Sequence, residues 1–304
     1  MNGHIPPASI RTFVVTVDTH QVDLASDRLW QLGVRALEER SPADGGAGTE
    51  LWTSVGQDDA AIARAAAALE PGWTWRVVDV PTAFSETWRE HVEPSWLAED
   101  LVIVPEWIDI DVGDGVTRVV IEPAGAFGLG DHPTSQLSAR ALRTELRRLV
   151  GRGTTSCSVL DVGCGTGVLS IVAALSGATR VRAVDIAADA VAATSANAAL
   201  NGVNDRIEVD DLLVDQLDGT YDVVVANILA PVLIASAADL TRLVGPDGTL
   251  IISGILADAH EHVVAALDPL HVIETTTQDG WAAVVLRPVG ADGMPGAPTG
   301  LQGA

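Results

Sequence analysis

The chain has 304 residues, which is enough for two domains and a sizeable hydrophobic core. Its formal net charge of −23, from 41 acidic against 18 basic residues, would repel a phosphate backbone, so the composition argues against direct binding of nucleic acid. All 18 basic residues are arginine, and the lack of lysine excludes Schiff-base chemistry on a lysine of this chain.

The sequence predicts neither a membrane segment nor a disulfide framework. No apolar run reaches the roughly 20 residues of a membrane-spanning helix, and the first residues lack the basic-then-apolar pattern of a signal peptide. We therefore expect a cytoplasmic protein without membrane contact. Cys157 and Cys164 bracket a predicted strand and would lie about 20 Å apart, too far for a disulfide, so both are expected to be small buried side chains.

Residues 10–80 carry six short periodic segments after a loose N-terminal tail. The predicted strands are 11–17, 34–39, 51–55 and 73–80, and the predicted helices are 22–32 and 58–69. In chain order they form βαββαβ, the order of a small α+β ferredoxin-like domain. Seven of the eight tryptophans lie before residue 108, which supports a boundary between two separately built units; they could fill a small core or form a surface for docking a protein.

A stretch rich in glycine and proline, residues 123–135, lies between two predicted strands and a predicted helix. The strands are 101–107 and 116–122, and the helix is 136–150. Thr134 or Ser135 is predicted as the N-cap of this helix, because either hydroxyl can accept a hydrogen bond from a free backbone N–H. The stretch is either a structural lead-in to the helix or one wall of a ligand site.

The most informative segment is residues 158–190. An apolar strand enters the loop Gly163-Cys164-Gly165-Thr166-Gly167, a helix follows, and a second apolar strand ends at Asp185. Strand, glycine loop, helix and strand make the βαβ unit of a doubly wound fold. Glycines let a ligand approach the backbone, and an acid after the second strand is placed to accept hydrogen bonds from a ribose.

The spacing of the loop favours one class of cofactor over another. A dinucleotide loop has the pattern G-x-G-x-x-G, but the position of its third glycine is occupied here by Val168. The acid Asp161, two residues before the first glycine, makes the loop resemble the S-adenosylmethionine loop of class I methyltransferases, D/E-x-G-x-G-x-G. The alternatives are NAD-linked oxidoreduction, which Val168 disfavours, and a glycine-rich turn without a ligand.

The remaining segments complete a seven-stranded, largely parallel sheet that ends in an antiparallel pair. The further predicted strands are 207–209, 221–226, 249–253, 272–276 and 281–286, and the further predicted helices are 188–201, 232–243 and 257–267. A turn is expected at 245–248. The predicted domains are 10–80 (ferredoxin-like, substrate recognition), 81–100 (linker with a short helix near 86–91), 101–287 (methyltransferase) and 288–304 (disordered tail).

Four motifs together resemble one family, the ribosomal protein L-eleven methyltransferases (PrmA type). They are A-F-G-x-G-x-H-P-T at 126–134, D-V-G-C-G-T-G at 161–167, the acid Asp185 and A-N-I-L-A at 226–230. The likeness extends over roughly residues 11–287. It implies a seven-stranded Rossmann-like domain after a small ferredoxin-like domain, and methyl transfer from S-adenosylmethionine to lysine amino groups of a basic ribosomal protein of the large subunit. It also implies multiple lysine methylations and a monomer.

The resemblance also implies which residues form the site. Gly163 and its loop would approach the methionine part of the cofactor, Asp185 would hold the ribose, and Asn227 would lie beside the transferring methyl group as the catalytic residue. The cofactor-binding residues implied are Ser135, Thr134, Asp161, Gly163, Gly165, Gly167, Asp185 and Asn227. Ser135 stands where the family has a threonine, and Leu129 and Asp131 also depart from the family pattern.

Other functional readings stay open at this point. His132 could act as an acid or base or be structural, and Asp210 and Asp211 could approach an adenine or be solvated. No histidine grouping predicts a metal site, and no nucleophile elbow is present. A related methyltransferase acting on another protein's lysines or on a small molecule, and a non-catalytic adaptor that binds S-adenosylmethionine, are the competing functions.

Overall fold

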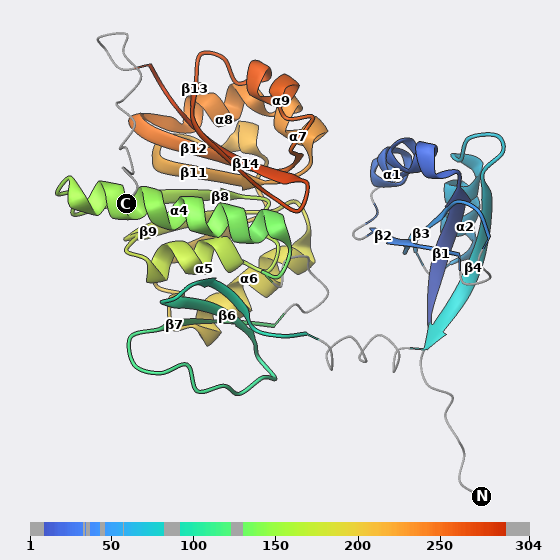
Figure 1. Ribbon diagram of the computed structural model, residues 1–304, viewed down its shortest axis with the longest axis horizontal. Coiled ribbons are helices and arrows are strands. Elements are labelled where there is room, and N and C mark those ends of the chain that lie inside the picture. The colour runs from blue at the N-terminus through green and yellow to red at the C-terminus, as the bar shows by residue number, and fades with distance from the viewer. Residues whose placement is uncertain are drawn as a thin grey trace, which may run out of the picture. The chain divides into compact units, whose positions relative to one another are not determined.

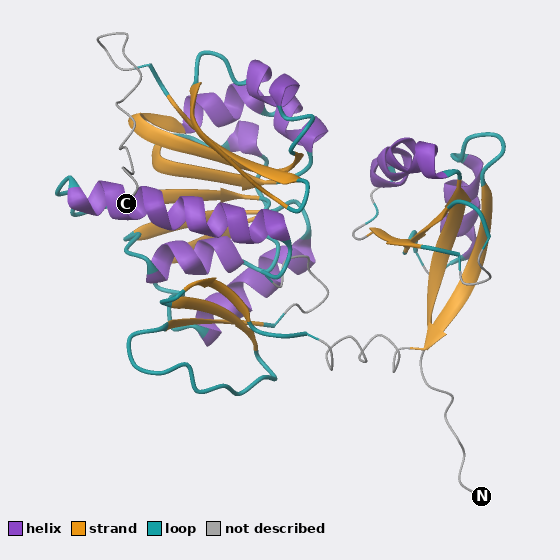
Figure 2. Cartoon of the chain, in the orientation of Figure 1, coloured by secondary structure: helices purple, strands orange, loops and turns teal. Residues whose placement is uncertain are grey.

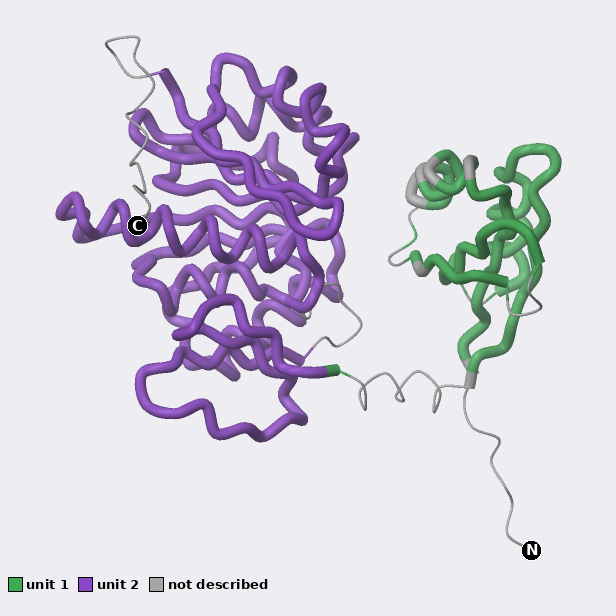
Figure 3. Tube along the Cα trace, viewed as in Figure 1, with its two compact units in different colours: residues 1–92 green, residues 93–304 purple. Residues whose placement is uncertain are grey.

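The computed structural model describes residues 9–32, 34, 37–42, 46–56, 58–81, 92–122 and 130–289. The short helix expected near residues 86–91 and most of the two predicted tails lie outside these ranges, as do residues 123–129. The chain divides into two compact units, residues 1–92 and residues 93–304, and each is described by itself (Figure 3). None of the described helices is long and apolar enough to cross a membrane.

The first unit combines a four-stranded antiparallel sheet with two helices (Figures 1 and 2). Its elements are β1 (Ser9–Val17), η1 (Thr19–Gln21), α1 (Val22–Gln31), β2 (Leu37–Arg40), β3 (Thr49–Thr53), α2 (Asp59–Ala67) and β4 (Thr74–Pro81). The strands lie in the order β2-β3-β1-β4. Phe13, Val15 and Val17 alternate along β1 and share one core with Leu29 of α1 and Ile62 of α2, so the period of two in the sequence marks the covered face of the sheet.

The second unit contains a large sheet and a small one. The large sheet has the strand order β10-β9-β8-β11-β12-β14-β13, and the small one has the order β5-β6-β7. The strands are β5 (Ser95–Ala98), β6 (Leu101–Pro105), β7 (Thr117–Ile121), β8 (Ser158–Val162), β9 (Arg180–Val184), β10 (Ile207–Asp210), β11 (Tyr221–Asn227), β12 (Val244–Leu256), β13 (His271–Gln278) and β14 (Trp281–Arg287). Within the large sheet β14 is antiparallel to both of its neighbours, as expected for a terminal hairpin on a parallel sheet.

Helices cover both faces of the large sheet (Figures 1 and 2). The helical elements of this unit are α4 (Pro133–Gly151), α5 (Val168–Leu175), α6 (Ala188–Leu200), η3 (Val214–Gln216), α7 (Ala230–Ala235), α8 (Ala237–Leu243) and α9 (Glu261–Ala266). Val159 and Val225 share a core with α4, α5 and α6, whereas Leu160 and Val224 share the opposite core with α7, α8 and α9. The small sheet joins the first of these cores through residues such as Ile103.

Two local predictions in this unit were wrong. Residues Ser95–Ala98 form strand β5 inside the predicted linker, and the helix expected at 232–243 is divided at Ser236 into α7 and α8. The turn expected at 245–248 is present as an insertion within β12, because Val244 and Thr249 pair with Tyr221 and Val223 across a shift of register. A Cβ atom at Gly248 would lie 2.8 Å from the backbone nitrogen of Gly245, so the chain turns tightly between these two glycines.

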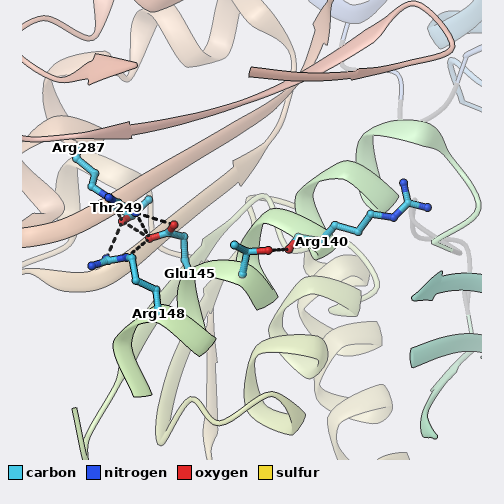
Figure 4. A network of polar contacts seen from close by, with 6 residues as sticks. Arg140, Glu145, Arg148, Thr249 and Arg287 are labelled. Carbon is cyan, nitrogen blue, oxygen red and sulfur yellow. Dashed lines mark hydrogen bonds and ion pairs between the residues drawn. The ribbon is translucent and has the colours of Figure 1, made fainter. Parts of the chain in front are cut away.

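A buried ionic cluster fixes helix α4 to the large sheet (Figure 4). The Glu145 carboxylate accepts hydrogen bonds from Nη2 of Arg287 at 2.7 Å, Nε of Arg148 at 2.8 Å and Oγ1 of Thr249 at 2.8 Å. Burial alone would raise the pKa of Glu145, but these three donors outweigh it and lower the pKa below its usual value. Arg140, a little more than one turn earlier on α4, points away from the cluster toward the small sheet, where it donates to the Leu97 carbonyl oxygen.

Candidate functional site

The predicted site segments meet at the carboxyl ends of three neighbouring strands. Val162 of β8 pairs with Val184 of β9 on one side and with Ala226 of β11 on the other. The glycine loop, Asp185 and Asn227 therefore leave the sheet side by side. The chain passes from β8 to β9 in one direction and reaches β11 in the other, and ligands of open α/β sheets bind at such a switch point.

The loop after β8 turns through three glycines in the left-handed region. The φ angles of Gly163, Gly165 and Gly167 are 74°, 55° and 82°. A Cβ atom at Gly163 would also lie 2.3 Å from Cγ2 of Ile228, and one at Gly167 would lie 2.8 Å from Cγ2 of Thr194. The backbone thus requires glycine at all three positions, whatever the loop binds.

Asp185 is tied directly to this loop. Its Oδ2 accepts the backbone N–H of Gly165 at 3.0 Å, and its Oδ1 accepts the backbone N–H of Ala187 at 2.9 Å. A carboxylate oxygen can accept more than one hydrogen bond, so the half-buried side chain retains the capacity to accept ribose hydroxyls. The next residue, Ile186, is 79% exposed and offers an apolar surface beside the acid; its signal in the sequence is an isoleucine directly after a strand-ending aspartate.

Asp161 lies beneath the loop instead of at the open edge. The side chain is buried, and its Oδ2 accepts the hydroxyl of Ser170 at 2.6 Å. Burial raises the pKa of Asp161 to about 6, partly offset by the hydrogen bond from Ser170. Among the described residues Oδ1 has no hydrogen-bond partner, so this acceptor fits a ligand that brings a donor, such as the ammonium group of an amino acid.

Asn227 ends strand β11, half-buried, in register with Ser253 of β12. The next residue, Ile228, packs between Gly163 and Gly254. Besides the contact of Ile228 with Gly163, a Cβ atom at Gly254 would lie 2.4 Å from the Ile228 carbonyl oxygen. Backbone packing on both sides therefore fixes where Asn227 leaves the sheet.

The start of helix α4 differs from the prediction. Helix α4 begins at Pro133, and its N-cap is His132, whose ring Nδ1 accepts the backbone N–H of Thr134 at 3.3 Å. Thr134 and Ser135 lie inside the first turn, both buried. The prediction of a hydroxyl cap was wrong. Pro133 has no backbone N–H that needs an acceptor, and the imidazole of His132 accepts the N–H of Thr134.

His132 and its helix turn contact the β13–β14 hairpin. The His132 ring packs edge-on against Trp281, with 5.0 Å between ring centroids, and Nε2 of Gln278 donates to Oε1 of Gln136 at 2.9 Å. Burial lowers the pKa of His132, and the charge of Asp131 opposes the shift only in part. A neutral, packed imidazole fits a structural role for His132.

The chemistry of the site fits a nucleoside that carries no phosphate. Residues 157–179 contain no basic side chain, so the loop has no counter-charge for a pyrophosphate, and Val168 is buried where a dinucleotide site needs its third glycine. Asp210, considered for the adenine, instead pairs with Arg182 at 2.7 Å. The described residues contain no group of three or more His, Cys, Asp or Glu that could hold a metal ion.

A family model, curated relatives and one solved structure agree on the family of this chain. The family model "Ribosomal protein L11 methyltransferase (PrmA)" matches residues 63–288. Ribosomal protein L11 methyltransferases of Geobacter sp. (strain M21) and of Citrifermentans bemidjiense are each 40% identical over 204 residues, covering 67% of this chain and 66% of theirs. The match thus spans slightly less than two thirds of these relatives' length. The crystal structure of ribosomal protein L11 methylase from Lactobacillus delbrueckii subsp. bulgaricus superimposes with a TM-score of 0.58 at 31% identity, over 65% of this chain and 99% of that one.

Proposed function

The chain belongs to the ribosomal protein L11 methyltransferase (PrmA) family, and we propose that it transfers methyl groups from S-adenosylmethionine to amino groups of ribosomal protein L11. The observation that carries the proposal is the family match over residues 63–288, which includes the glycine loop, Asp185 and Asn227. The relatives' names supply the acceptor.

The residues present fit S-adenosylmethionine. The orphaned Oδ1 of Asp161 and the glycine loop would receive the methionine part, and Asp185 would accept the ribose hydroxyls. The exposed side chain of Ile186 would pack against the adenine. Thr134 and Ser135, in the first turn of α4, would also line the cofactor site.

When bound, S-adenosylmethionine supplies a methyl group already activated by its positive sulfur. The lone pair of a neutral amine forms the new N–C bond as the C–S bond breaks, the sulfur keeps the bonding electrons, and the amine then releases a proton to water. The side-chain oxygen of Asn227 and nearby backbone carbonyls would accept the N–H groups of the amine and hold it in line at about 3 Å. A lysine acceptor beside a positive sulfur has a lowered pKa, which favours the neutral nucleophile.

The first unit would present the acceptor. Its βαββαβ order and the strand order β2-β3-β1-β4 support a ferredoxin-like substrate-recognition domain over residues 10–80. Because β5 pairs with β6, residues from Ser95 onward would belong to the methyltransferase domain, which shortens the linker predicted at 81–100. A chain of net charge −23 suits a basic ribosomal protein, and such an acceptor would place the reaction in the cytoplasm.

Mass spectrometry of purified L11 tests this function. L11 incubated with the protein and S-adenosylmethionine should gain mass in steps of one methyl group, and the same mixture with S-adenosylhomocysteine in place of S-adenosylmethionine should gain none. If L11 gains no mass while calorimetry shows S-adenosylmethionine binding, the acceptor is wrong. If a lysate of other proteins is not methylated either, the protein is a binding adaptor.

A further inference from the structure

Helix α6 holds the glycine loop through two buried side chains. Oγ1 of Thr194 donates to the carbonyl oxygen of Gly165 at 3.0 Å, and Nδ2 of Asn197 donates to the carbonyl oxygen of Thr166 at 2.9 Å. Thr194 and Asn197 are three residues apart and share one face of the helix. Two successive carbonyls of the loop are therefore fixed from α6.

The amide of Asn197 also forms hydrogen bonds with the backbone of Glu122, directly after strand β7. Its Nδ2 donates to the Glu122 carbonyl oxygen at 2.8 Å, and its Oδ1 accepts the Glu122 backbone N–H at 2.9 Å. Glu122 directly follows β7 and begins the connection to helix α4, which carries Ser135. Both N–H groups and the oxygen of this amide are used, so a single side chain links the glycine loop to the end of strand β7.

Asn201 holds β7 in the same way, but among the described residues it makes no hydrogen bond to the loop. Its Oδ1 accepts the Val120 N–H at 2.8 Å, and its Nδ2 donates to the Val120 carbonyl oxygen at 2.7 Å. Four helical residues rise about 6 Å, close to the rise of two strand residues, so Asn197 and Asn201 match Glu122 and Val120. Asn201 thus provides a matched control for Asn197.

We propose that Asn197 is a positioning residue of the cofactor site, which sets the separation between the glycine loop at Thr166 and the end of strand β7 at Glu122. The inference rests on the proposed use of S-adenosylmethionine. Without this amide, its hydrogen bonds to the Thr166 carbonyl oxygen and to the backbone of Glu122 are lost, and the glycine loop can shift relative to the end of strand β7. The affinity for S-adenosylmethionine then falls, whereas the acceptor's own contacts are unaltered.

Titration calorimetry with S-adenosylmethionine on the full chain tests the proposal. Asn197→Ala should weaken binding about tenfold, and Asn201→Ala, which loses the equivalent pair of contacts at Val120, should bind within about twofold of the wild type. In steady-state kinetics Asn197→Ala should raise the KM for S-adenosylmethionine and leave the KM for the acceptor protein unchanged. Hydrogen exchange of residues 163–167 should be faster in Asn197→Ala than in Asn201→Ala. Thr194→Val, which removes the other loop contact, should also weaken binding and serves if Asn197→Ala does not fold.

The outcomes separate this inference from the proposed function. Wild-type protein that binds S-adenosylmethionine, together with equal affinities for Asn197→Ala and Asn201→Ala, would overturn the positioning role alone. Equal losses of affinity in both variants, in proportion to their loss of thermal stability, would also overturn the positioning role, because the effect would then be one of general destabilisation. Wild-type protein that does not bind S-adenosylmethionine would overturn the proposed function and the inference with it.

Discussion

The backbone N–H of Gly165 donates to Oδ2 of Asp185 at 3.0 Å, which joins the glycine loop to the end of strand β9. The carboxylate thus stabilises the loop and, under the proposed function, also accepts hydrogen bonds from the ribose. A change at Asp185 should therefore act on the binding of the cofactor more than on the later chemical step.

Replacing Asp185 and replacing Asn227 should have different effects. Asp185→Ala should weaken S-adenosylmethionine binding about 100-fold, because it removes hydrogen bonds to a charged acceptor. Asn227→Ala should lower turnover about 100-fold and leave that affinity within about threefold, because the amide acts on the amine. Calorimetry and mass spectrometry of L11 measure the two quantities, with the exposed residues Asp247 and Asn204 changed to alanine as controls. An equally large loss of affinity in both variants would contradict these roles.

Two glycines with similar backbone conformations should respond differently to alanine. Gly163 and Gly202 both have positive φ, 74° and 65°, so alanine is strained at either position. A Cβ atom at Gly202 meets nothing within 4 Å, whereas one at Gly163 meets Ile228. Gly202→Ala should cost about 1 kcal/mol of unfolding free energy and Gly163→Ala about 3 kcal/mol.

Chemical denaturation measures both costs. Adding Ile228→Ala to Gly163→Ala should recover part of the loss by removing the clash. Equal costs for the two single variants would show that the close approach of Ile228 is not what demands glycine in the loop.

The buried carboxyl of Asp161 should make stability depend on pH. Its pKa in the folded protein, about 6, lies above the unfolded value, so the protonated form contributes stability that is complete below about pH 4 and is lost as the pH rises through 6. The difference in unfolding free energy between Asp161→Asn and the wild type should therefore shift by about 1 kcal/mol in favour of the variant from pH 5 to pH 8. Denaturant titrations at both pH values measure it, and a constant difference would place the pKa of Asp161 near its ordinary value.

The Glu145 cluster should contribute far more to stability than an exposed pair. Glu145→Ala leaves Arg148 and Arg287, each with 13% of its side chain exposed, without their carboxylate, and should cost about 3 kcal/mol. Asp239→Ala, which removes the partner of the more exposed Arg242, should cost less than about 1 kcal/mol. Urea denaturation compares the two, and similar costs would show that the buried cluster adds nothing beyond a surface ion pair.

The sequence predicted the large sheet well because its inner strands, such as β8, β11 and β14, are largely buried apolar runs. Strand β5 escaped prediction because only Leu97 in it is buried, and its pairing with β6 is interrupted by a bulge. The N-cap role of His132 was not predicted, because imidazole is an uncommon capping group and the helix start is set by Pro133, which follows it.

Within the candidate site, sequence reasoning singled out residues that belong to recognisable motifs. It missed Ser170, Thr194 and Asn197, whose partners lie nine or more residues away in the chain. The available signal was Asn197 in the interior of a predicted helix, because asparagine is a poor helix former and needs a reason to be there.

Helix α4 carries Ser135 near one end and Glu145 ten residues further along, a separation of about 15 Å on a rigid rod. The ionic cluster is therefore one of the anchors that set the angle of this helix, together with the contacts of Gln136 and Arg140. A tilt of about 4° at Glu145 would move Ser135 by about 1 Å, and misplacements of that size can cost an enzyme about 100-fold in rate. Substitutions at Arg148, Thr249 or Arg287 would then impair function over a distance, through the angle of one helix.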